Sequence, residues 1–230
     1  MSHSVACVIF DLDGTLYDQA ALRRRMAAVM ARSLLRDPRR LREIMIVRWV
    51  RTYREELAER SATDVAVVQY RAAAERFGRE ETEIELMIEE WIERRPLALL
   101  PSCRLPAAAD LLMALRDRGV RTAVLSDYPP VAKLDALGLQ VDAAECTTDS
   151  FPGALKPDPA ALALLASSLG FDLGECLYVG DRDDRDGEMA RRAGMRFVLA
   201  ARGVREAEAR TIVDATGRPG RLSGMRGCGS

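Results

Sequence analysis

Polar residues stand directly after three strand-like apolar runs of this sequence, at Asp11, Ser126 and Asp181. Further aspartates lie close by, since Asp13 follows Asp11 by two residues and Asp186 follows Asp181 by five. A cluster of carboxylates is a hard-oxygen site that suits Mg²⁺, and the cation offsets the repulsion among the charges. Such a set predicts metal-assisted phosphoryl transfer, in which an ionised aspartate can itself be the nucleophile.

Two lysines draw attention because every other basic residue of the sequence is an arginine. Lys156 enters a predicted helix through Pro157, and its ammonium is a point charge suited to phosphate, whereas Lys133 has no such context. Ser126 supplies a hydroxyl donor, and the adjacent amide, that of Asp127, supplies a second. Each residue alone has a plainer interpretation as a turn, a helix cap or a surface side chain, so the prediction rests on the whole pattern.

The elements that must position these residues follow from hydrophobic patterning. Residues 5–10 form a continuous apolar run that ends at Asp11, which is typical of a buried parallel strand. Further strands are predicted over 121–125, 175–179 and 196–200, alternating with helices over 106–118, 130–137, 158–169 and 184–193. This alternation predicts an α/β fold with a parallel sheet, and ligands of such sheets bind beyond the carboxyl ends of the strands.

A helical insertion fills the gap between Asp11 and Ser126, which is too long for one crossover connection. Between residues 18 and 100 the apolar residues recur at helical spacing, with breaks at Asp37-Pro38 and Phe77-Gly78, so about four packed helices are expected. The aromatic and methionine residues of these stripes are interpreted as core.

Composition excludes several classes of function. Thirty-four basic and 35 acidic residues leave a net charge of −1, which argues against a protein that coats nucleic acid or an anionic membrane. The single histidine, His3, rules out a Ser-His-Asp triad and a histidine-rich zinc site. Five scattered cysteines without a CxxC pair indicate a reduced, cytoplasmic compartment. No apolar stretch reaches the ~20 residues of a membrane span, and 5–10 is too short for a signal peptide core.

The insertion is unevenly charged. Residues 21–60 hold 12 arginines and 5 acidic residues, whereas 61–100 hold 5 arginines and 9 acidic residues. Two solvated helix faces that attract each other explain this most simply. The functional alternative is a basic surface turned toward an anionic substrate, with Arg48, Arg51 and Arg54 as candidates for a second anionic group.

Four segments resemble, in order, the four signatures of the haloacid dehalogenase-like (HAD) hydrolases. They are Asp11–Leu16, Ser126, Lys156-Pro157, and Val179–Asp181 with Asp186, and the resemblance covers about residues 5–200. It implies a Rossmann-like core of residues 1–17 and 101–213 with an all-helical cap at 18–100, typical of the phosphoglycolate phosphatase and phosphoglucomutase branch. Residues 214–230, with five glycines and no apolar period, are expected to form a loose tail.

The resemblance also implies catalytic roles. Asp11 is the expected nucleophile and Asp13 the general acid and base. Ser126, Asp127 and Lys156 are expected to hold the phosphoryl group, and Lys156 also offsets the charge of Asp11.

The expected Mg²⁺ ligands are Asp11, the backbone carbonyl of Asp13, Asp181 and Asp186. Asp184 is an alternative to Asp186, although the spacing favours Asp186. The sequence departs from the family pattern at Asp127, where relatives often carry asparagine, and in the unusually charged segment 182–185.

The leading hypothesis is a Mg²⁺-dependent phosphatase that hydrolyses a small organic phosphate monoester through an aspartyl-phosphate. Asp13 favours this over a true dehalogenase, because relatives with that activity lack an acid there. A phosphosugar mutase with the same core site is one alternative, and a non-catalytic binding scaffold with a basic cap face is another. The expected partner is a small phosphorylated metabolite, with neither nucleic acid nor membrane.

Overall fold

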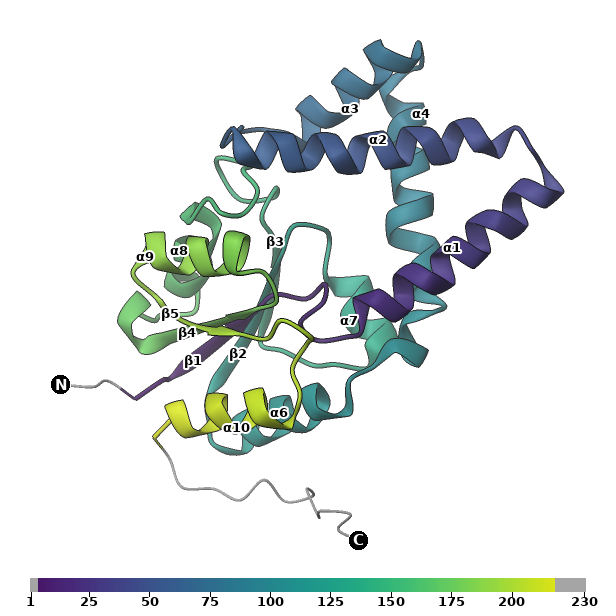
Figure 1. Cartoon of the computed structure of the whole chain (residues 1–230). Helices are drawn as coiled ribbons and strands as arrows, with labels where there is room; N and C mark the ends of the chain where they lie inside the picture. Colours follow the sequence, from purple (N-terminus) through teal and green to yellow (C-terminus); the bar gives the residue numbers. More distant parts are fainter. Residues whose placement is uncertain (1–3, 218–230) are drawn as a thin grey trace, which may run out of the picture.

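A five-stranded parallel sheet forms the centre of the fold in the computed structural model, which describes residues 4–217 (Figure 1). Its order is β3-β2-β1-β4-β5, and every neighbouring pair is parallel. The strands are β1 (Cys7–Phe10), β2 (Arg121–Ser126), β3 (Ala143–Cys146), β4 (Cys176–Gly180) and β5 (Arg196–Leu199). The predicted α/β fold is therefore confirmed, and β1 occupies the middle of the sheet.

Helices cover both faces of the sheet, because successive side chains of a strand point to opposite sides. Val8 and Phe10 of β1 pack with α6 (Pro106–Asp117) and α10 (Glu206–Ala215), whereas Cys7 and Ile9 pack with α8 (Ala160–Ser168) and α9 (Glu188–Ala193). Helix α7 (Val131–Leu137) follows β2. All of β1 is buried, which explains its continuous apolar sequence.

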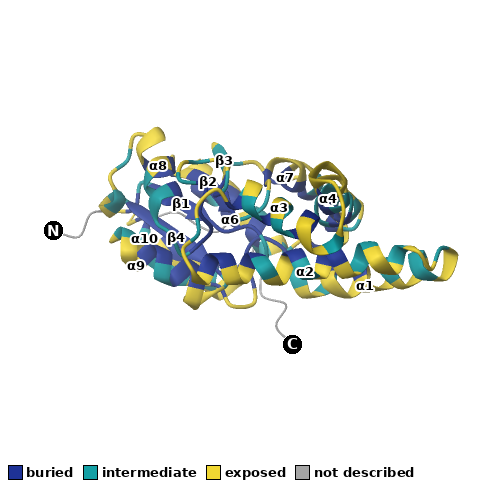
Figure 2. Ribbon diagram, turned by 90° about the horizontal axis from the view of Figure 1, so that it is seen from above, coloured by how far each residue is buried: buried dark blue, intermediate teal, exposed yellow. Residues whose placement is uncertain are grey.

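The insertion after β1 is helical, as predicted, and is called the cap here. It consists of α1 (Gln19–Arg36), α2 (Arg40–Glu59), α3 (Val65–Phe77), α4 (Glu81–Ile88), a π-helical turn (Glu89–Arg94) and α5 (Arg95–Leu97). A 3₁₀ turn (Leu100–Cys103) then leads back to the core. Figure 2 shows buried residues concentrated in the strands, whereas α1 and α2 expose residues along most of their length.

The cap touches the core at both of its ends. Tyr17 and Arg104 form an isolated antiparallel bridge where the chain leaves and re-enters the core. Asp18 then begins α1 by accepting a hydrogen bond from the amide of Ala21 at 2.8 Å. At the far end, Asp64 and Val65 donate backbone hydrogen bonds to the loop at residues 152–153. These contacts hold the cap beside the carboxyl ends of the strands.

Some elements differ from the sequence-based expectation. Strand β3 was not predicted, because only the last of its four residues, Cys146, is buried and the four form no apolar run. The helix expected over 184–193 begins as a π-helical turn, Asp183–Gly187. Helix α10 was also missed and extends to Ala215, two residues into the expected tail. The rest of that tail, from residue 218, lies outside the described residues. Within residues 4–217, no helix combines the length and hydropathy needed to cross a membrane.

Two leucines of α8 provide a matched test of the sheet packing. Leu162 is fully buried, whereas Leu164 is 51% exposed. Replacing Leu162 with alanine leaves a cavity and should lower the free energy of unfolding by about 2–5 kcal/mol. Leu164→Ala should change it by less than about 0.5 kcal/mol in the same urea titration. Equal effects from the two variants would contradict this assignment of the buried face.

Candidate active site

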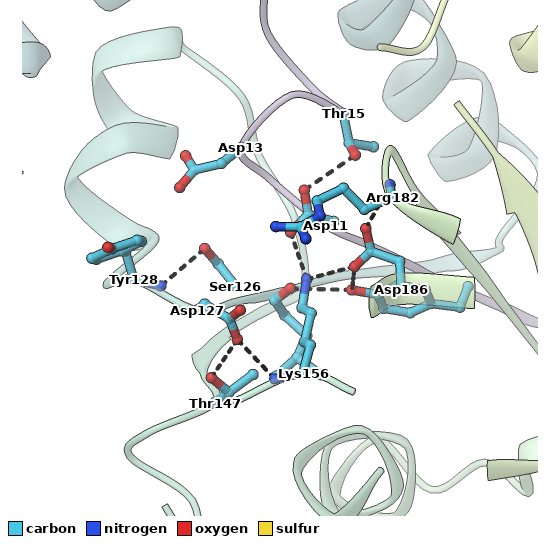
Figure 3. Close-up of polar contacts among 12 residues, drawn as sticks. Asp11, Asp13, Thr15, Ser126, Asp127, Tyr128, Thr147, Lys156, Arg182 and Asp186 are labelled. Carbon is cyan, nitrogen blue, oxygen red and sulfur yellow. Dashed lines mark hydrogen bonds and ion pairs between the residues drawn. The ribbon is translucent and has the colours of Figure 1, made fainter. Parts of the chain in front are cut away.

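The amine of Lys156 links two carboxylates at the carboxyl end of the sheet (Figure 3). Its Nζ lies 2.5 Å from Oδ1 of Asp11 and 2.9 Å from Oδ1 of Asp186. Thr15 donates a hydrogen bond to the other oxygen of Asp11 at 3.1 Å. Asp11 follows β1 directly, and Lys156 lies in the loop before α8. Because Lys156 is only 3% exposed, its charge interacts with the carboxylates with little screening from water.

Asp181 completes a group of three carboxylates with Asp11 and Asp186. One oxygen from each lies within 4.8 Å of the other two, a spacing that can hold a metal ion. Burial and the neighbouring aspartates raise the pKa of Asp11 well above its ordinary value, despite the opposing effect of Lys156. Burial and Asp186 raise the pKa of Asp181 to about 6. A cation would relieve this crowding, and three carboxylate ligands match the hard-oxygen preference of Mg²⁺.

Two glycines permit the carboxylates to come this close. Gly14 has φ +99°, and a Cβ atom there would lie 2.2 Å from Oδ2 of Asp181. A Cβ on Gly180 would lie 2.4 Å from Cγ of Asp186. A side chain at either position would therefore push the neighbouring carboxylate away from its place in the group.

Asp13 lies in a separate network beside this group. Its carboxylate accepts hydrogen bonds from Nζ of Lys133 at 2.7 and 2.8 Å and from the hydroxyl of Tyr17 at 2.6 Å. Burial acts to raise the pKa of Asp13, but the charge and hydrogen bonds of Lys133 and Tyr17 outweigh it and lower the pKa. Asp13 is therefore held as a carboxylate in this arrangement.

Ser126 is the last residue of β2, and Asp127 follows it in the loop. Ser126 is 1% exposed, and its hydroxyl oxygen accepts a hydrogen bond from the amide of Tyr128 at 3.3 Å. The carboxylate of Asp127 accepts hydrogen bonds from the Thr147 hydroxyl at 2.8 Å and from the backbone amide of Lys156 at 3.2 Å. The acidic residue that departs from the family pattern thus joins two loops of the site.

The cap reaches the site through two neighbouring residues of α2. The buried guanidinium of Arg54 donates hydrogen bonds to the backbone oxygen of Asp127 and to Oε1 of Gln69, and it lies 4.3 Å from the centre of the Tyr128 ring. Glu55 pairs with the Arg182 and Arg185 guanidiniums at 3.2 and 2.6 Å. The charged segment 182–185 therefore binds the cap.

All the predicted side chains of the site line one cavity of about 380 Å³ between core and cap. The structure thus brings together Asp11, Asp13, Ser126, Asp127, Lys156, Asp181 and Asp186. Asp184 does not join them, since its side chain is 67% exposed and pairs with Arg182 at 2.7 Å. Of the three cap arginines, Arg51 and Arg54 line the cavity and Arg48 does not.

Sequence reasoning missed three contributors to the site. It gave no role to Lys133, although the scarcity of lysine was a usable signal, nor to Tyr17, which binds Asp13. It also left out Tyr178, whose hydroxyl lies 3.3 Å from Oδ1 of Asp186. Tyr178 reads as an ordinary member of an apolar strand, so no sequence signal marks it.

The fold and the site define an α/β protein with a helical cap and a carboxylate-rich centre at the carboxyl end of a parallel sheet. Residues 5–194 match the family model described as haloacid dehalogenase-like hydrolase. The chain belongs to the haloacid dehalogenase-like hydrolases.

Three relatives of this chain are named phosphoglycolate phosphatase. The protein from Xylella fastidiosa Temecula1 is 31% identical over 206 residues, covering 87% of this chain and 82% of the relative. The protein from Rhodospirillum rubrum is 37% identical over 101 residues, a match that spans 43% of this chain and only 42% of the relative's length. The chain is therefore similar to the phosphoglycolate phosphatases within the family.

Solved structures share the fold across different chemistries. L-2-haloacid dehalogenase from Xanthobacter autotrophicus is 24% identical with a TM-score of 0.56, covering 94% of this chain and 85% of that one. β-Phosphoglucomutase from Clostridium difficile is 16% identical with a TM-score of 0.59, covering 91% and 97%. The likeness extends to a dehalogenase and a mutase, so the fold alone does not select the reaction.

Gly14 allows a test of the close approach to Asp181. Gly14→Ala should weaken Mg²⁺ binding at least about tenfold in titration calorimetry, because the new methyl group displaces the carboxylate. Gly78→Ala is the matched control, since Gly78 also has positive φ but has nothing within 4 Å of the added Cβ atom. Both variants should lose about 1–3 kcal/mol of stability from backbone strain. Wild-type Mg²⁺ affinity in Gly14→Ala would refute the proposed role of this glycine.

Proposed function

We propose that this protein is a Mg²⁺-dependent phosphatase that hydrolyses a small organic phosphate monoester, with Asp11 as the nucleophile. The observation that carries the proposal is the environment of Asp11. This buried carboxylate is held by Thr15 and Lys156 and opens onto the same cavity as Asp13 and three further aspartates. The relatives named phosphoglycolate phosphatase support a small phosphorylated substrate.

The residues that would hold Mg²⁺ are Asp11, Asp181 and Asp186, with the backbone carbonyl of Asp13 as a fourth ligand. The three carboxylates fit the ion because their oxygens converge within 4.8 Å and are hard donors. When bound, Mg²⁺ would neutralise negative charge on the phosphoryl group and on the carboxylates.

In the first half of the reaction, an oxygen of Asp11 bonds to phosphorus while the ester oxygen–phosphorus bond breaks. Lys156 orients the Asp11 carboxylate and offsets negative charge there. The hydroxyl of Ser126 and the backbone amide of Asp127 are the further donors assigned to the phosphoryl oxygens. The leaving oxygen takes up a proton. For a poor leaving group Asp13 supplies it as general acid, after first accepting that proton from solvent, because its ion pair with Lys133 holds it as a carboxylate beforehand.

In the second half, a water oxygen bonds to phosphorus while the Asp11–phosphorus bond breaks and releases inorganic phosphate. Asp13 accepts the proton that this water loses. The ion pair between Asp13 and Lys133 favours the carboxylate form, which is the form this step needs. An ester with a leaving group that needs no proton, such as p-nitrophenyl phosphate, is therefore a suitable first substrate.

Two variants distinguish the proposed roles of Asp11 and Asp13 in the hydrolysis of p-nitrophenyl phosphate. Asp11→Asn should lose activity by at least about 10³-fold, because the nucleophile is gone, and EDTA should abolish wild-type activity. Asp13→Asn should release one equivalent of p-nitrophenol rapidly and then turn over slowly, because water is no longer deprotonated. Rapid-mixing absorbance measurements distinguish the two patterns.

The other outcomes decide between the alternatives. Transfer of phosphate between positions of a sugar, found by product analysis with sugar monophosphates, would establish the mutase. Wild-type protein inactive on every phosphate ester, with a salt-dependent shift on DNA or RNA, would favour the non-catalytic scaffold. Full activity in Asp11→Asn or in EDTA would refute the phosphatase mechanism proposed here.

A matched pair of variants in the segment after β4 tests whether Asp186 or Asp184 is the last carboxylate ligand of Mg²⁺. Asp186→Asn should raise the Mg²⁺ concentration for half-maximal activity about 10–100-fold, because Asp186 is buried among the carboxylates. Asp184→Asn should leave that concentration unchanged, since Asp184 is exposed and pairs with Arg182. If Asp184→Asn raised this concentration and Asp186→Asn did not, Asp184 would be the ligand instead of Asp186.

A further inference from the structure

A second cavity, of about 310 Å³, adjoins the candidate active site on the side of Asp13. The two cavities share five lining residues, which are Asp13, Gln19, Arg23, Arg51 and Tyr128. The second cavity lies between the cap and α7, since α1, the π-helical turn and Lys133 all line it. Its volume is in the range of pockets that hold small molecules.

The walls of this second cavity are mostly apolar, in contrast to the charged site cavity. Helix α1 contributes Leu22, Met26 and Met30, and the segment after α4 contributes Trp91, Ile92 and Pro96. Trp91 is only 1% exposed, and its indole nitrogen donates a hydrogen bond to Glu43 at 3.1 Å, which fixes the ring. The cavity is therefore built from a packed surface of the cap.

The position of Asp13 relates this cavity to the reaction. Asp13 lines both cavities, and the proposed mechanism assigns it the proton for the leaving oxygen. The alcohol part of the ester must therefore lie on the Asp13 side when the phosphoryl group lies beside Asp11. On the Asp13 side, the second cavity with its apolar walls is the space that lies beyond the leaving oxygen.

We infer that the substrate is a phosphate monoester of an alcohol with an apolar carbon chain or ring, which fills this second cavity. This inference rests on the proposed phosphatase function and names its substrate class. An apolar alcohol gains from leaving water for these walls, whereas a charged group there would lose its hydration.

The charged side chains at the second cavity raise the competing possibility that the substrate carries a second anionic group there. Lys133 is already paired with Asp13, whereas the side chains of Arg23 and Arg51 are exposed and make no hydrogen bond or ion pair with another described residue. Either arginine would suit a second anionic group, as in phosphoglycolate. Because both guanidiniums are exposed and the walls beyond them are apolar, we assign the cavity to an uncharged apolar group.

The first experiment is a chain-length series on the wild-type protein with Mg²⁺. It uses methyl, ethyl, butyl and hexyl phosphate, with phenyl phosphate and 2-phosphoglycolate as comparison substrates. We expect kcat/KM to rise by up to about fourfold for each added methylene, because each one is removed from water. Hexyl or phenyl phosphate should be a better substrate than 2-phosphoglycolate.

A matched pair of tryptophan variants locates the effect. Ala27 is exposed and lines the second cavity, whereas the next residue, Ala28, is exposed on the same helix and lines neither cavity. Ala27→Trp should reduce the hexyl-to-methyl ratio of kcat/KM at least tenfold by filling the cavity. Ala28→Trp should keep the wild-type ratio. Dissociation constants of methylphosphonate and hexylphosphonate, which are not hydrolysed, should follow the same pattern.

The outcomes separate this inference from the proposed function. Hydrolysis that is independent of chain length, or fastest with 2-phosphoglycolate, would overturn the apolar substrate class and leave the phosphatase intact. An unchanged hexyl-to-methyl ratio in Ala27→Trp would also overturn it. Inactivity toward every ester would overturn the proposed function, and this inference with it.

Discussion

Three carboxylates and one ammonium lie close together at the carboxyl end of the sheet. Much of the surrounding structure offsets the repulsion among these carboxylates or leaves room for them. Lys156 bonds to both Asp11 and Asp186, and two glycines leave room for the aspartates to approach the backbone. One buried ammonium does not balance three carboxylates, so burial and mutual repulsion hold the pKa of Asp11 high. The site therefore favours a bound cation, and this electrostatic demand connects the fold to the phosphatase activity proposed above.

The same site is bounded by the cap, which contacts both segments that flank the proposed phosphate position. Arg54 binds the loop after β2, and Glu55 binds two arginines of the loop after β4. Neighbouring residues of α2 thus bridge to opposite sides of the cavity. Movement of α2 would break both sets of contacts together, so cap position and loop geometry are coupled.

Much of the fold was predictable because the central strands are buried on both faces and read as continuous apolar runs. The positions of Asp11, Ser126 and Asp181 after those runs were enough to bring them to one edge. The edge strand β3 was not predictable, since half-exposed residues such as Ala143 and Ala144 lack that signal. The pairing of Lys133 with Asp13 joins residues 120 positions apart and depends on tertiary packing, which no local pattern encodes.

The two lysines have a practical consequence for labelling chemistry. Lys133 and Lys156 are the only lysines of the sequence, and both are buried at 4% and 3% exposure in ion pairs with aspartates. An amine-acylating reagent can reach these two side chains only when the structure around them opens. The rate at which these two lysines are acylated would therefore report how often the structure around them opens, and no engineered probe is needed.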